Sequence, residues 1–390
     1  MSYIKRILRP LLRTADDADS TETAETKAYV RQKFKLRMVS VAISFAYLIY
    51  MGVHGGLQLD AIVKPWANGN QWLELFGVAG LFAVIAEAIS FPIDFYSGFV
   101  IEHKFGLSTQ SFGAYMWKWF KMNALMLVFG GLLLAGLYAL LWHFTAWWWV
   151  LATVGVLLVS VVIGKLMPVV LVPIFYKVTP VEDQSLVDRL KTIAQGTGLT
   201  VSNVSRFSMS KETKKANAFL SGMGSTKHVM LGDTLVDAFT PEEIEAVFAH
   251  EVGHYVHGHI AKGIVMSTIV TLLSFFVCNV VLTNLAPALG YASFTAPAAL
   301  PLFFLVLGVF SLLIGPFEKA VSRYFERQSD WYSLERMQNV PAHKAAFKRL
   351  AEINKAELTP PKWKVLLFHT HPPINERLAM ADRFAELNKA

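Results

Sequence analysis

Six long apolar stretches constrain this sequence more than any other feature. They cover about residues 38–56, 72–95, 122–142, 147–172, 263–285 and 297–317. A helix of about 20 apolar residues is long enough to cross the hydrocarbon core of a bilayer. Only 17% of the 390 residues are charged, whereas soluble proteins carry about 25%. The sequence therefore predicts a polytopic membrane protein, mainly α-helical, with about six transmembrane helices.

The basic residues gather on one side of the predicted membrane. Lysine and arginine are frequent before the first stretch, after the second, between the fourth and fifth, and after the sixth, whereas the other three loops hold only Lys64. Because cytoplasmic loops carry an excess of basic residues, both termini are predicted to lie in the cytoplasm. The same bias explains the net charge of +7, so the expected partner is the lipid bilayer and no nucleic acid is expected.

The order of apolar and polar segments divides the chain into five parts. We predict a cytoplasmic N-terminal segment over 1–36, four transmembrane helices over 37–175 with a cytoplasmic loop at 96–121, a cytoplasmic part over 176–262, two transmembrane helices over 263–317, and cytoplasmic helices over 318–390. In the part over 176–262, an amphipathic helix is expected at about 181–195. Short runs such as VSRFSM, NAFLSG and KHVMLG are typical of small strands. The predicted fold class is therefore mainly α, with a small α+β cytoplasmic domain.

The string HEVGH at residues 250–254 is the most informative motif. The Thr-Pro-Glu-Glu segment shortly before it is typical of a helix start, so the motif is predicted to lie on a helix. On a helix, His250 and His254 face the same way, as two ligands of one Zn²⁺ ion must. Glu251 is then placed to act as general base on a water molecule at the metal. Gly253 leaves room for a partner element to pack closely.

The alternative to a metal site is a solvated helix face with scattered histidines, because His257 and His259 follow the motif. The sequence predicts no role for these two histidines. The good helix start and Gly253 favour the metal site.

A catalytic zinc ion needs a third protein ligand. The HEVGH motif precedes the fifth apolar stretch, and the sixth stretch returns the chain to the same side of the membrane. Acidic residues soon after the sixth stretch are therefore expected at the depth of the two histidines. They are Glu318, Glu326, Asp330 and Glu335, and the pattern alone does not choose between them.

The residues after the sixth stretch carry a resemblance to a known family. Ser322, Arg323, Glu326 and Asp330 form the pattern S-R-x-x-E-x-x-x-D. Together with HEVGH, this pattern resembles the gluzincin membrane peptidases of the CAAX prenyl protease type, a group related to the bacterial heat-shock membrane protease. Further segments are similar to that family: FPIDFYSGFVIEHKFGLSTQSF, LVPIFYKVTPVED, NAFLSG, HVMLGDTL and FHTHPPINERL. The resemblance covers about residues 33–378, although eukaryotic members have a seventh span.

The resemblance implies a cage of helices around a water-filled chamber, with the zinc site facing inward. It implies Glu326 as the third zinc ligand. Asp330 matches an aspartate one turn later, which could accept the outward N–H of a ligating histidine, and Arg323 is expected beside it in the same outer layer of the site. The alternative for Asp330 and Arg323 is an ordinary charge cluster on a helix surface.

Two accessory residues are predicted. His371, in the His-Pro-Pro signature, could donate a hydrogen bond to the oxyanion that forms on the scissile carbonyl; the alternative is a loop histidine held by two prolines. Asn217 lies in a predicted edge strand, KKANAF, which could pair with an extended substrate; the alternative is a turn residue.

Two residues within the apolar stretches also carry predictions. Glu87 is expected to face the protein interior or a water-filled cavity, because a charge at that depth is costly in lipid. Cys278 is expected to pack as a small apolar residue. As the single cysteine, it excludes a disulfide framework.

We therefore predict a zinc-dependent integral-membrane endopeptidase with one Zn²⁺ per chain, bound by His250, His254 and Glu326. The predicted substrate is a peptide or protein, with or without an isoprenoid chain, and the resemblance implies removal of C-terminal residues from isoprenylated CAAX proteins. A membrane quality-control protease without prenyl specificity is the first alternative. A metal- or proton-linked transporter and a non-catalytic scaffold are the others, and the intact Glu251 argues against the scaffold.

The predicted location is a prokaryotic inner membrane with the active site on the cytoplasmic side. The six spans favour a prokaryotic member of the family. The endoplasmic reticulum membrane is the alternative.

Overall fold

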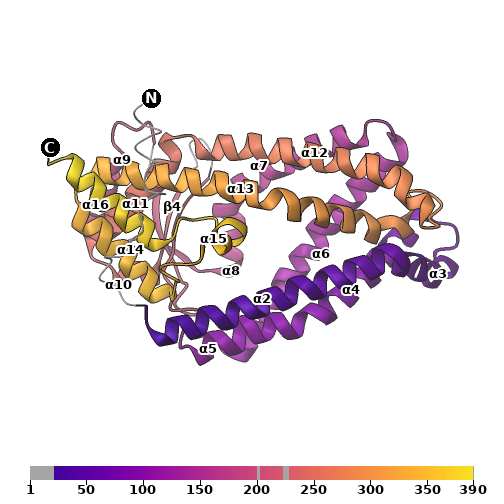
Figure 1. The fold of residues 1–390 in the computed structure, drawn as a ribbon, viewed down its shortest axis with the longest axis horizontal. Coiled ribbons are helices and arrows are strands. Elements are labelled where there is room, and N and C mark those ends of the chain that lie inside the picture. Colours follow the sequence, from indigo (N-terminus) through magenta and orange to yellow (C-terminus); the bar gives the residue numbers. More distant parts are fainter. Residues whose placement is uncertain (1–21, 200–202, 223–227, 390) are drawn as a thin grey trace.

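Long helices dominate the fold (Figure 1). The computed structural model describes residues 22–199, 203–222 and 228–389. Among these residues, six helical segments are long and apolar enough to cross a membrane: Ala24–Ala67, Gln71–Lys104, Phe112–His143, Trp148–Phe175, His259–Ala288 and Pro297–Met337. Their number and order confirm the predicted fold class. The predicted N-terminal segment before residue 22 lies outside the described residues.

Several of the six segments contain more than one helical element. They consist of α2 (Ala24–Tyr50) with α3 (Gly56–Ala67), α4 (Gln71–Phe95) with α5 (Glu102–Lys104), α6 (Phe112–His143), α7 (Trp148–Leu166) with α8 (Val172–Phe175), α12 (His259–Ala288), and a short 3₁₀ turn at Pro297–Ala299 with α13 (Leu300–Met337). π-helical stretches join the consecutive helices of the first, second and fourth segments, at Met51–Gly55, Tyr96–Ile101 and Met167–Leu171.

Two of these helices extend well beyond the apolar stretches that predict them. α2 begins at Ala24, where the Thr23 side chain accepts a hydrogen bond from the backbone N–H of Thr26 at 3.1 Å. α13 continues to Met337, because no glycine or proline interrupts the sequence after Pro316. Hydropathy marks only the apolar part of such a helix. As a result, the acidic residues expected after the sixth stretch lie on the same helix as that stretch.

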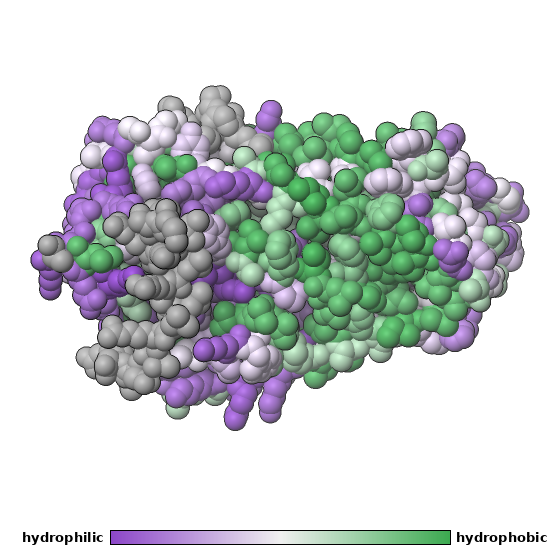
Figure 2. Space-filling model, turned by 45° about the horizontal axis from the view of Figure 1, so that its top comes forward, coloured by the Kyte–Doolittle hydropathy of each residue, from purple (hydrophilic) through white to green (hydrophobic). Residues whose placement is uncertain are grey.

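The surface matches a membrane protein. Figure 2 shows a broad hydrophobic band over the long helices, with hydrophilic residues gathered at the end of the molecule that carries α9, α11, α14 and α16. Inside the membrane part, Cys278 of α12 is fully buried in an apolar cluster with Tyr138, Trp148 and Leu282. Its packing role is as predicted. Glu87 accepts a hydrogen bond from the Trp119 indole N–H at 2.7 Å, so a neighbouring helix satisfies this carboxylate.

The water-exposed end combines helices with a small sheet. Its helices are α9 (Gln184–Ala194), α10 (Asp233–Ala238), α11 (Pro241–Val256), α14 (Val340–Asn354), α15 (Lys362–Phe368) and α16 (Ile374–Leu387). Its strands are β1 (Val178–Pro180), β2 (Asn203–Phe207), β3 (Ala218–Ser221) and β4 (His228–Gly232). The three runs expected to form strands match β2, β3 and β4, apart from positions that lie outside the described residues.

The sheet has the strand order β1-β2-β4-β3. β2 and β4 are parallel, and the two outer strands pair antiparallel to their neighbours. β3 therefore lies at one edge of the sheet, and among the described residues no further strand pairs with its outer side. A core of buried apolar side chains joins the sheet to α9, α11 and α14, and includes Leu190, Leu231, Phe248 and Ala346.

Candidate metal centre

The HEVGH motif lies on α11, and local signals begin this helix where the sequence predicts. The Thr240 side chain accepts from the Glu243 backbone N–H, and the Glu243 carboxylate accepts from the Thr240 N–H at 2.9 Å. This reciprocal pair satisfies two N–H groups that a helix start leaves open. Arg349 of α14 also contacts Glu243 at 3.0 Å. The start of α11 is thereby attached to the helix that packs beside it.

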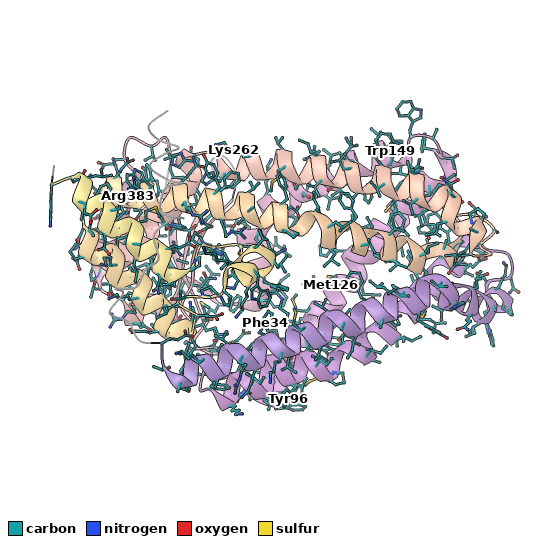
Figure 3. The ribbon with its side chains drawn as sticks, in the orientation of Figure 1. Phe34, Tyr96, Met126, Trp149, Lys262 and Arg383 are labelled. Atoms are coloured by element: carbon teal, nitrogen blue, oxygen red, sulfur yellow. The ribbon has the colours of Figure 1, made fainter. Side chains whose placement is uncertain are left out.

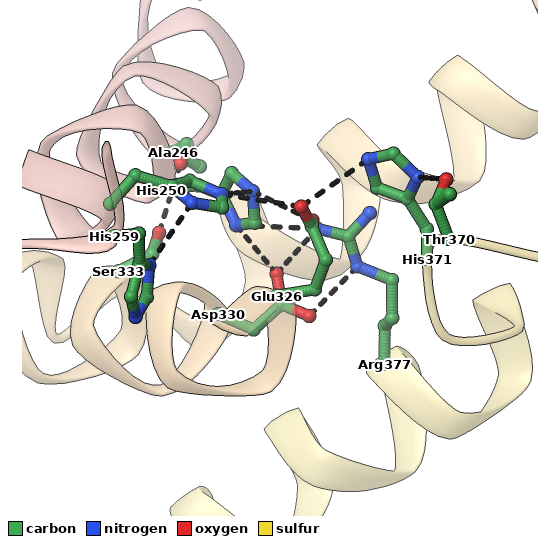
Figure 4. A network of polar contacts seen from close by, with 10 residues as sticks. Ala246, His250, His259, Glu326, Asp330, Ser333, Thr370, His371 and Arg377 are labelled. Atoms are coloured by element: carbon green, nitrogen blue, oxygen red, sulfur yellow. Dashed lines mark hydrogen bonds and ion pairs between the residues drawn. The ribbon is translucent and has the colours of Figure 1, made fainter. Parts of the chain in front are cut away.

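Three side chains of α11 and α13 converge, and Figure 4 shows two of them, His250 and Glu326, side by side. His250 and His254 lie one turn apart on α11, with their Nε2 atoms 3.2 Å apart. Glu326 of α13 places Oε2 3.2 Å from His250 Nε2 and Oε1 3.3 Å from His254 Nε2. One ligand atom from each residue lies within 4.8 Å of the others. The structure therefore brings together the three residues predicted as metal ligands.

The chemistry of this set suits a cation. Glu326 Oε2 is buried and, besides His250 Nε2 at 3.2 Å, has no hydrogen-bond partner among the described residues. Burial lowers the pKa of His250, but the charge of Asp330 and the hydrogen bonds to Asp330 and Glu326 outweigh burial and raise the pKa to about 10. Positive charge is thus favoured between the two carboxylates. A divalent metal ion held by two imidazoles and one carboxylate fits this arrangement.

A buried network orients His250 from behind. Asp330 is fully buried, and its Oδ1 accepts from His250 Nδ1 at 2.8 Å. Arg377 of α16 donates to the same carboxylate, with Nε 2.9 Å from Oδ2 and Nη2 in contact with Oδ1. The guanidinium also lies over the Phe347 ring at 3.6 Å. Asp330 therefore lies behind His250, one of the candidate ligands, and accepts a hydrogen bond from it.

Arg377 is a site residue that no sequence pattern singled out. It lies within the His-Pro-Pro signature segment, but nothing in that segment indicates that its side chain reaches a carboxylate on α13. Because Asp330 is buried, a buried cation is the partner that its charge needs. A search for a basic residue to pair with Asp330 could have suggested a candidate, although not the helix that supplies it.

At its Nδ1 atom, His254 is oriented by a neighbouring histidine and not by a carboxylate. Its Nδ1 lies 3.1 Å from Nδ1 of His259, and His259 Nε2 lies 3.1 Å from Oε1 of Gln328. His259 is buried and stacks on Phe325, with ring centroids 4.3 Å apart. If His254 uses Nε2 for a metal, its Nδ1–H donates to His259, whose Nε2–H donates to the glutamine oxygen. This chain of hydrogen bonds gives His259 a position beside the candidate metal site.

The close approach of α11 and α13 depends on Gly253. A Cβ atom at this position would lie 2.8 Å from the Cα and 3.1 Å from the carbonyl oxygen of Ser329. Backbone atoms of α13 cannot move aside as a flexible side chain can. The space that Gly253 was expected to leave is therefore filled by the helix that carries Glu326.

We expect Gly253→Ala to push α11 and α13 apart, with a loss of about 1–3 kcal/mol in the free energy of unfolding. The histidines and Glu326 would separate, so metal affinity should fall as well. Thermal unfolding in detergent and metal content measure the two effects. Gly136→Ala on α6 is the matched control, because its added Cβ meets open space. Wild-type metal content in Gly253→Ala would contradict this account of the helix contact.

Glu251 lies beside the ligands, partly exposed to the cavities on either side of them. Burial raises the pKa of its carboxyl group, and Glu326 raises it further, while His250, His254 and a backbone hydrogen bond from Leu220 lower it. The net direction is upward, toward the range in which a carboxylate can both accept and release a proton. The contact with Leu220 also places this group next to the edge strand β3.

The structure places the remaining predicted residues around this centre. His371 is well exposed, with Nε2 3.4 Å from Glu326 Oε1 and Nδ1 2.9 Å from the Thr370 hydroxyl. Asn217 directly precedes β3, and its carbonyl accepts from the Gly232 N–H at 2.9 Å. Arg323 was expected beside the ligands; its Nη1 instead donates to the carbonyls of Val365 and His369, at 2.9 and 2.6 Å. Arg323 thus holds the segment that leads to His371.

Two cavities meet at the candidate site. The large cavity has a volume of about 850 Å³ and extends from Glu251 to α2 and α15. The second cavity, of about 430 Å³, lies between β3, α12 and α13. His250, Glu251 and His371 line both. β3 runs from one to the other, because Ala218 lines the large cavity and Leu220 the second. An extended chain laid along the free edge of β3 would therefore pass the metal site.

Comparisons with known proteins agree with this geometry. A model of peptidase family M48 matches residues 180–385. A second model, of the five N-terminal membrane helices of CAAX prenyl proteases, matches residues 10–177.

Similar proteins come from bacteria and eukaryotes. The chain is 26% identical to an uncharacterized metalloprotease of Bacillus subtilis, over 93% of this chain and 86% of the relative. It is 28% identical to CAAX prenyl protease 1 of Saccharomyces cerevisiae, over 80% of this chain and 72% of the relative. The crystal structure of S. mikatae Ste24p has the same fold, with a TM-score of 0.84, 22% identity, and coverage of 97% of this chain and 94% of that one.

Proposed function

The chain belongs to peptidase family M48 and is a membrane metalloendopeptidase, and we propose that its metal is one zinc ion bound by His250, His254 and Glu326. The observation that carries this proposal is the convergence of two imidazoles and one carboxylate within 4.8 Å. Two histidines and a glutamate are a common ligand set of catalytic zinc, which keeps one position open for water or substrate. The proposed metalloprotease part combines residues 176–262 with 318–390.

Each of the residues around the site has a separate proposed role in peptide hydrolysis. Zinc bound there would polarise the scissile carbonyl and make a water molecule more acidic. Glu251 takes a proton from the attacking water and delivers it to the nitrogen of the leaving amine. His371 donates a hydrogen bond from Nε2 to the oxyanion that forms when water attacks the scissile carbonyl. The exposed position of His371, held by Arg323 through the preceding loop, suits contact with substrate.

The free edge of β3 is the proposed binding surface for the substrate backbone. Asn354 of α14 fixes its start, accepting from the Ala216 N–H at 2.9 Å and donating to the Ala216 carbonyl at 3.2 Å. Backbone pairing along such an edge is independent of side chains. Asn217, at the entrance of this edge, is proposed to contact the substrate from the large cavity.

The substrate is proposed to be a protein or peptide with an isoprenylated CAAX C-terminus. The yeast, plant and human relatives named as CAAX prenyl proteases support this substrate class. A quality-control protease for membrane proteins is the second candidate, because a bacterial relative is similar over most of its length and carries no such name. We propose that the metal site faces the cytoplasm, from the distribution of basic residues, and that the chain resides in a prokaryotic inner membrane.

The test pairs elemental analysis with cleavage. The protein is purified in mild detergent, its zinc content is measured, and it is given a farnesylated CAAX peptide and the same peptide without the lipid. One zinc ion per chain and cleavage of the farnesylated peptide are expected. Equal cleavage of both peptides would favour quality control. Full activity in protein that contains no metal would overturn the proposed function.

His259 provides a separate test of the metal site. We expect His259→Ala to lower zinc affinity by about 10- to 100-fold, because it removes the hydrogen-bond partner of a ligating histidine. Zinc competition with a chelator of known affinity measures the effect. His228→Ala is the control. His228 lies on strand β4 and lines neither of the two cavities at the site, so this variant should keep wild-type affinity. An unchanged affinity in His259→Ala would show that His254 does not depend on this contact.

A further inference from the structure

Arg37 lines the large cavity from α2. Lys33, Phe34, Arg37 and Val41 all face this cavity, at the spacing of one side of a helix. His250, Glu251 and Asn217 line the same cavity. The exposed guanidinium and the proposed catalytic groups therefore line one open cavity.

Arg37 differs from the other basic residues of this cavity in its charge partners. Four other lysine or arginine side chains line it, and each contacts a carboxylate: Lys33 with Glu102, Lys355 with Glu25, Lys364 with Glu357 and Arg377 with Asp330. Within the described part of the chain, Arg37 has no ion pair or hydrogen bond. Its charge is therefore available to an anion that enters the cavity.

The guanidinium is held in place by an aromatic ring. Arg37 Cζ lies 4.9 Å from the centroid of Phe368, at the end of α15. Phe368 packs edge-to-face on Phe34, with centroids 5.5 Å apart, and Phe34 lies between α2 and α15 (Figure 3). A contact of this kind with an aromatic ring uses none of the N–H groups of the guanidinium as a hydrogen-bond donor to an oxygen. These groups match the two oxygens of a carboxylate.

The position of Phe368 relates Arg37 to the metal site. Phe368 is three residues before His371, so their Cα atoms are at most about 11 Å apart. An extended peptide of three residues covers about 10 Å. A substrate whose scissile bond lies at His371 and Glu251, and whose C-terminal side points into the large cavity, would thus bring a free C-terminus a few residues further on to the region of Arg37.

We propose that Arg37 binds the terminal α-carboxylate of the substrate and thereby directs cleavage to bonds a few residues from a free C-terminus. This inference rests on the proposed function, since it assigns a recognition group to the same site. It names the chemical feature that distinguishes a C-terminal tail from an internal segment of a membrane protein. A quality-control protease that cuts internal bonds has no need of such a group.

The test compares two peptides that differ only at the C-terminus. A farnesylated CAAX peptide is prepared as the free acid and as the C-terminal amide, and kcat/KM is measured for both. The wild-type protein should prefer the acid by about 10- to 100-fold, the effect of a hydrogen bond to a charged group. Arg37→Gln should remove most of this preference by lowering kcat/KM for the acid. Arg37→Lys should keep part of it, because the charge remains while the bidentate geometry is lost.

Two control variants show whether the effect belongs to Arg37 itself. Arg31→Gln removes an exposed charge from the same helix outside the cavity and should keep the wild-type preference. Asp94→Asn removes a carboxylate that lines the cavity from α4 and should also keep it. Zinc content and thermal unfolding are measured for every variant.

The outcomes distinguish this inference from the proposed function. Absence of cleavage of every peptide by zinc-loaded wild-type protein would count against the function itself. Cleavage of acid and amide at equal rates by the wild type, or an undiminished preference in folded Arg37→Gln, would overturn the role of Arg37 alone. Asp94→Asn could also lose as much of the preference as Arg37→Gln does. That result would assign the effect to Arg37 and Asp94 acting together and would overturn the proposed role of Arg37 alone.

Discussion

Glu251→Gln is expected to abolish measurable proteolysis while the protein keeps its zinc. The substitution preserves the size of the side chain and its contact with β3, but an amide cannot take a proton from water. Loss of a general base costs about 10²- to 10⁴-fold in rate. Glu251 is not one of the three proposed ligands, so the zinc content should stay at one ion per chain. Elemental analysis and peptide cleavage on the same preparation measure both quantities.

Glu242→Gln is the matched control for this experiment. Glu242 lies on the same helix, is partly exposed, and pairs with Arg189 at 2.7 Å. Its substitution should leave cleavage unchanged. Proteolysis at the wild-type rate by Glu251→Gln, in a preparation whose activity a zinc chelator abolishes, would contradict the assignment of the base.

Asp330→Ala is expected to have the largest effect on stability. The substitution leaves Arg377 buried without its carboxylate partner and removes the acceptor for His250 Nδ1–H. Breaking a buried ion pair from one side costs about 3–5 kcal/mol. We expect a large drop in the thermal unfolding midpoint in detergent, together with weaker zinc binding.

Two further variants show whether the buried charge is the cause. Asp330→Ala combined with Arg377→Met removes both charges and should be less destabilised than Asp330→Ala alone. Asp382→Ala breaks an exposed pair with Lys344 and should cost less than about 1 kcal/mol. If Asp330→Ala were no worse than Asp382→Ala, the network behind His250 would contribute nothing to folding.

The sequence is most informative where a short-range pattern has one physical reading. Apolar stretches of membrane-spanning length predict the six helices, and the i, i+4 spacing of His250 and His254 places both imidazoles on one face of α11. Topology then limits the third ligand to a few acids near one end of the sixth span. The choice of Glu326 among them comes from the family resemblance and not from spacing.

Contacts between distant segments are the part that the sequence did not predict. Nothing local indicates that Arg377 of α16 pairs with Asp330, that Gln328 accepts from His259, or that Arg323 holds the loop before His371. Each of these depends on how α13 packs against α11, α12 and α16, and a helix surface offers many alternative partners. Hydropathy also ends the sixth span near residue 317, because it records the lipid-facing part of α13 and not the continuation of the helix.

The continuity of α13 has a consequence for any attempt to separate the peptidase from its membrane. The polar segment 176–262 contains both histidines, but the carboxylate that completes their set lies on a helix whose other half is apolar and belongs to the sixth candidate membrane span. No contiguous water-soluble fragment that stops before the fifth span can carry all three groups. Because one chain segment connects the sixth span to Glu326, peptide hydrolysis has to take place close to the membrane surface. A detergent that changes the packing of the spans should therefore also lower the peptidase activity.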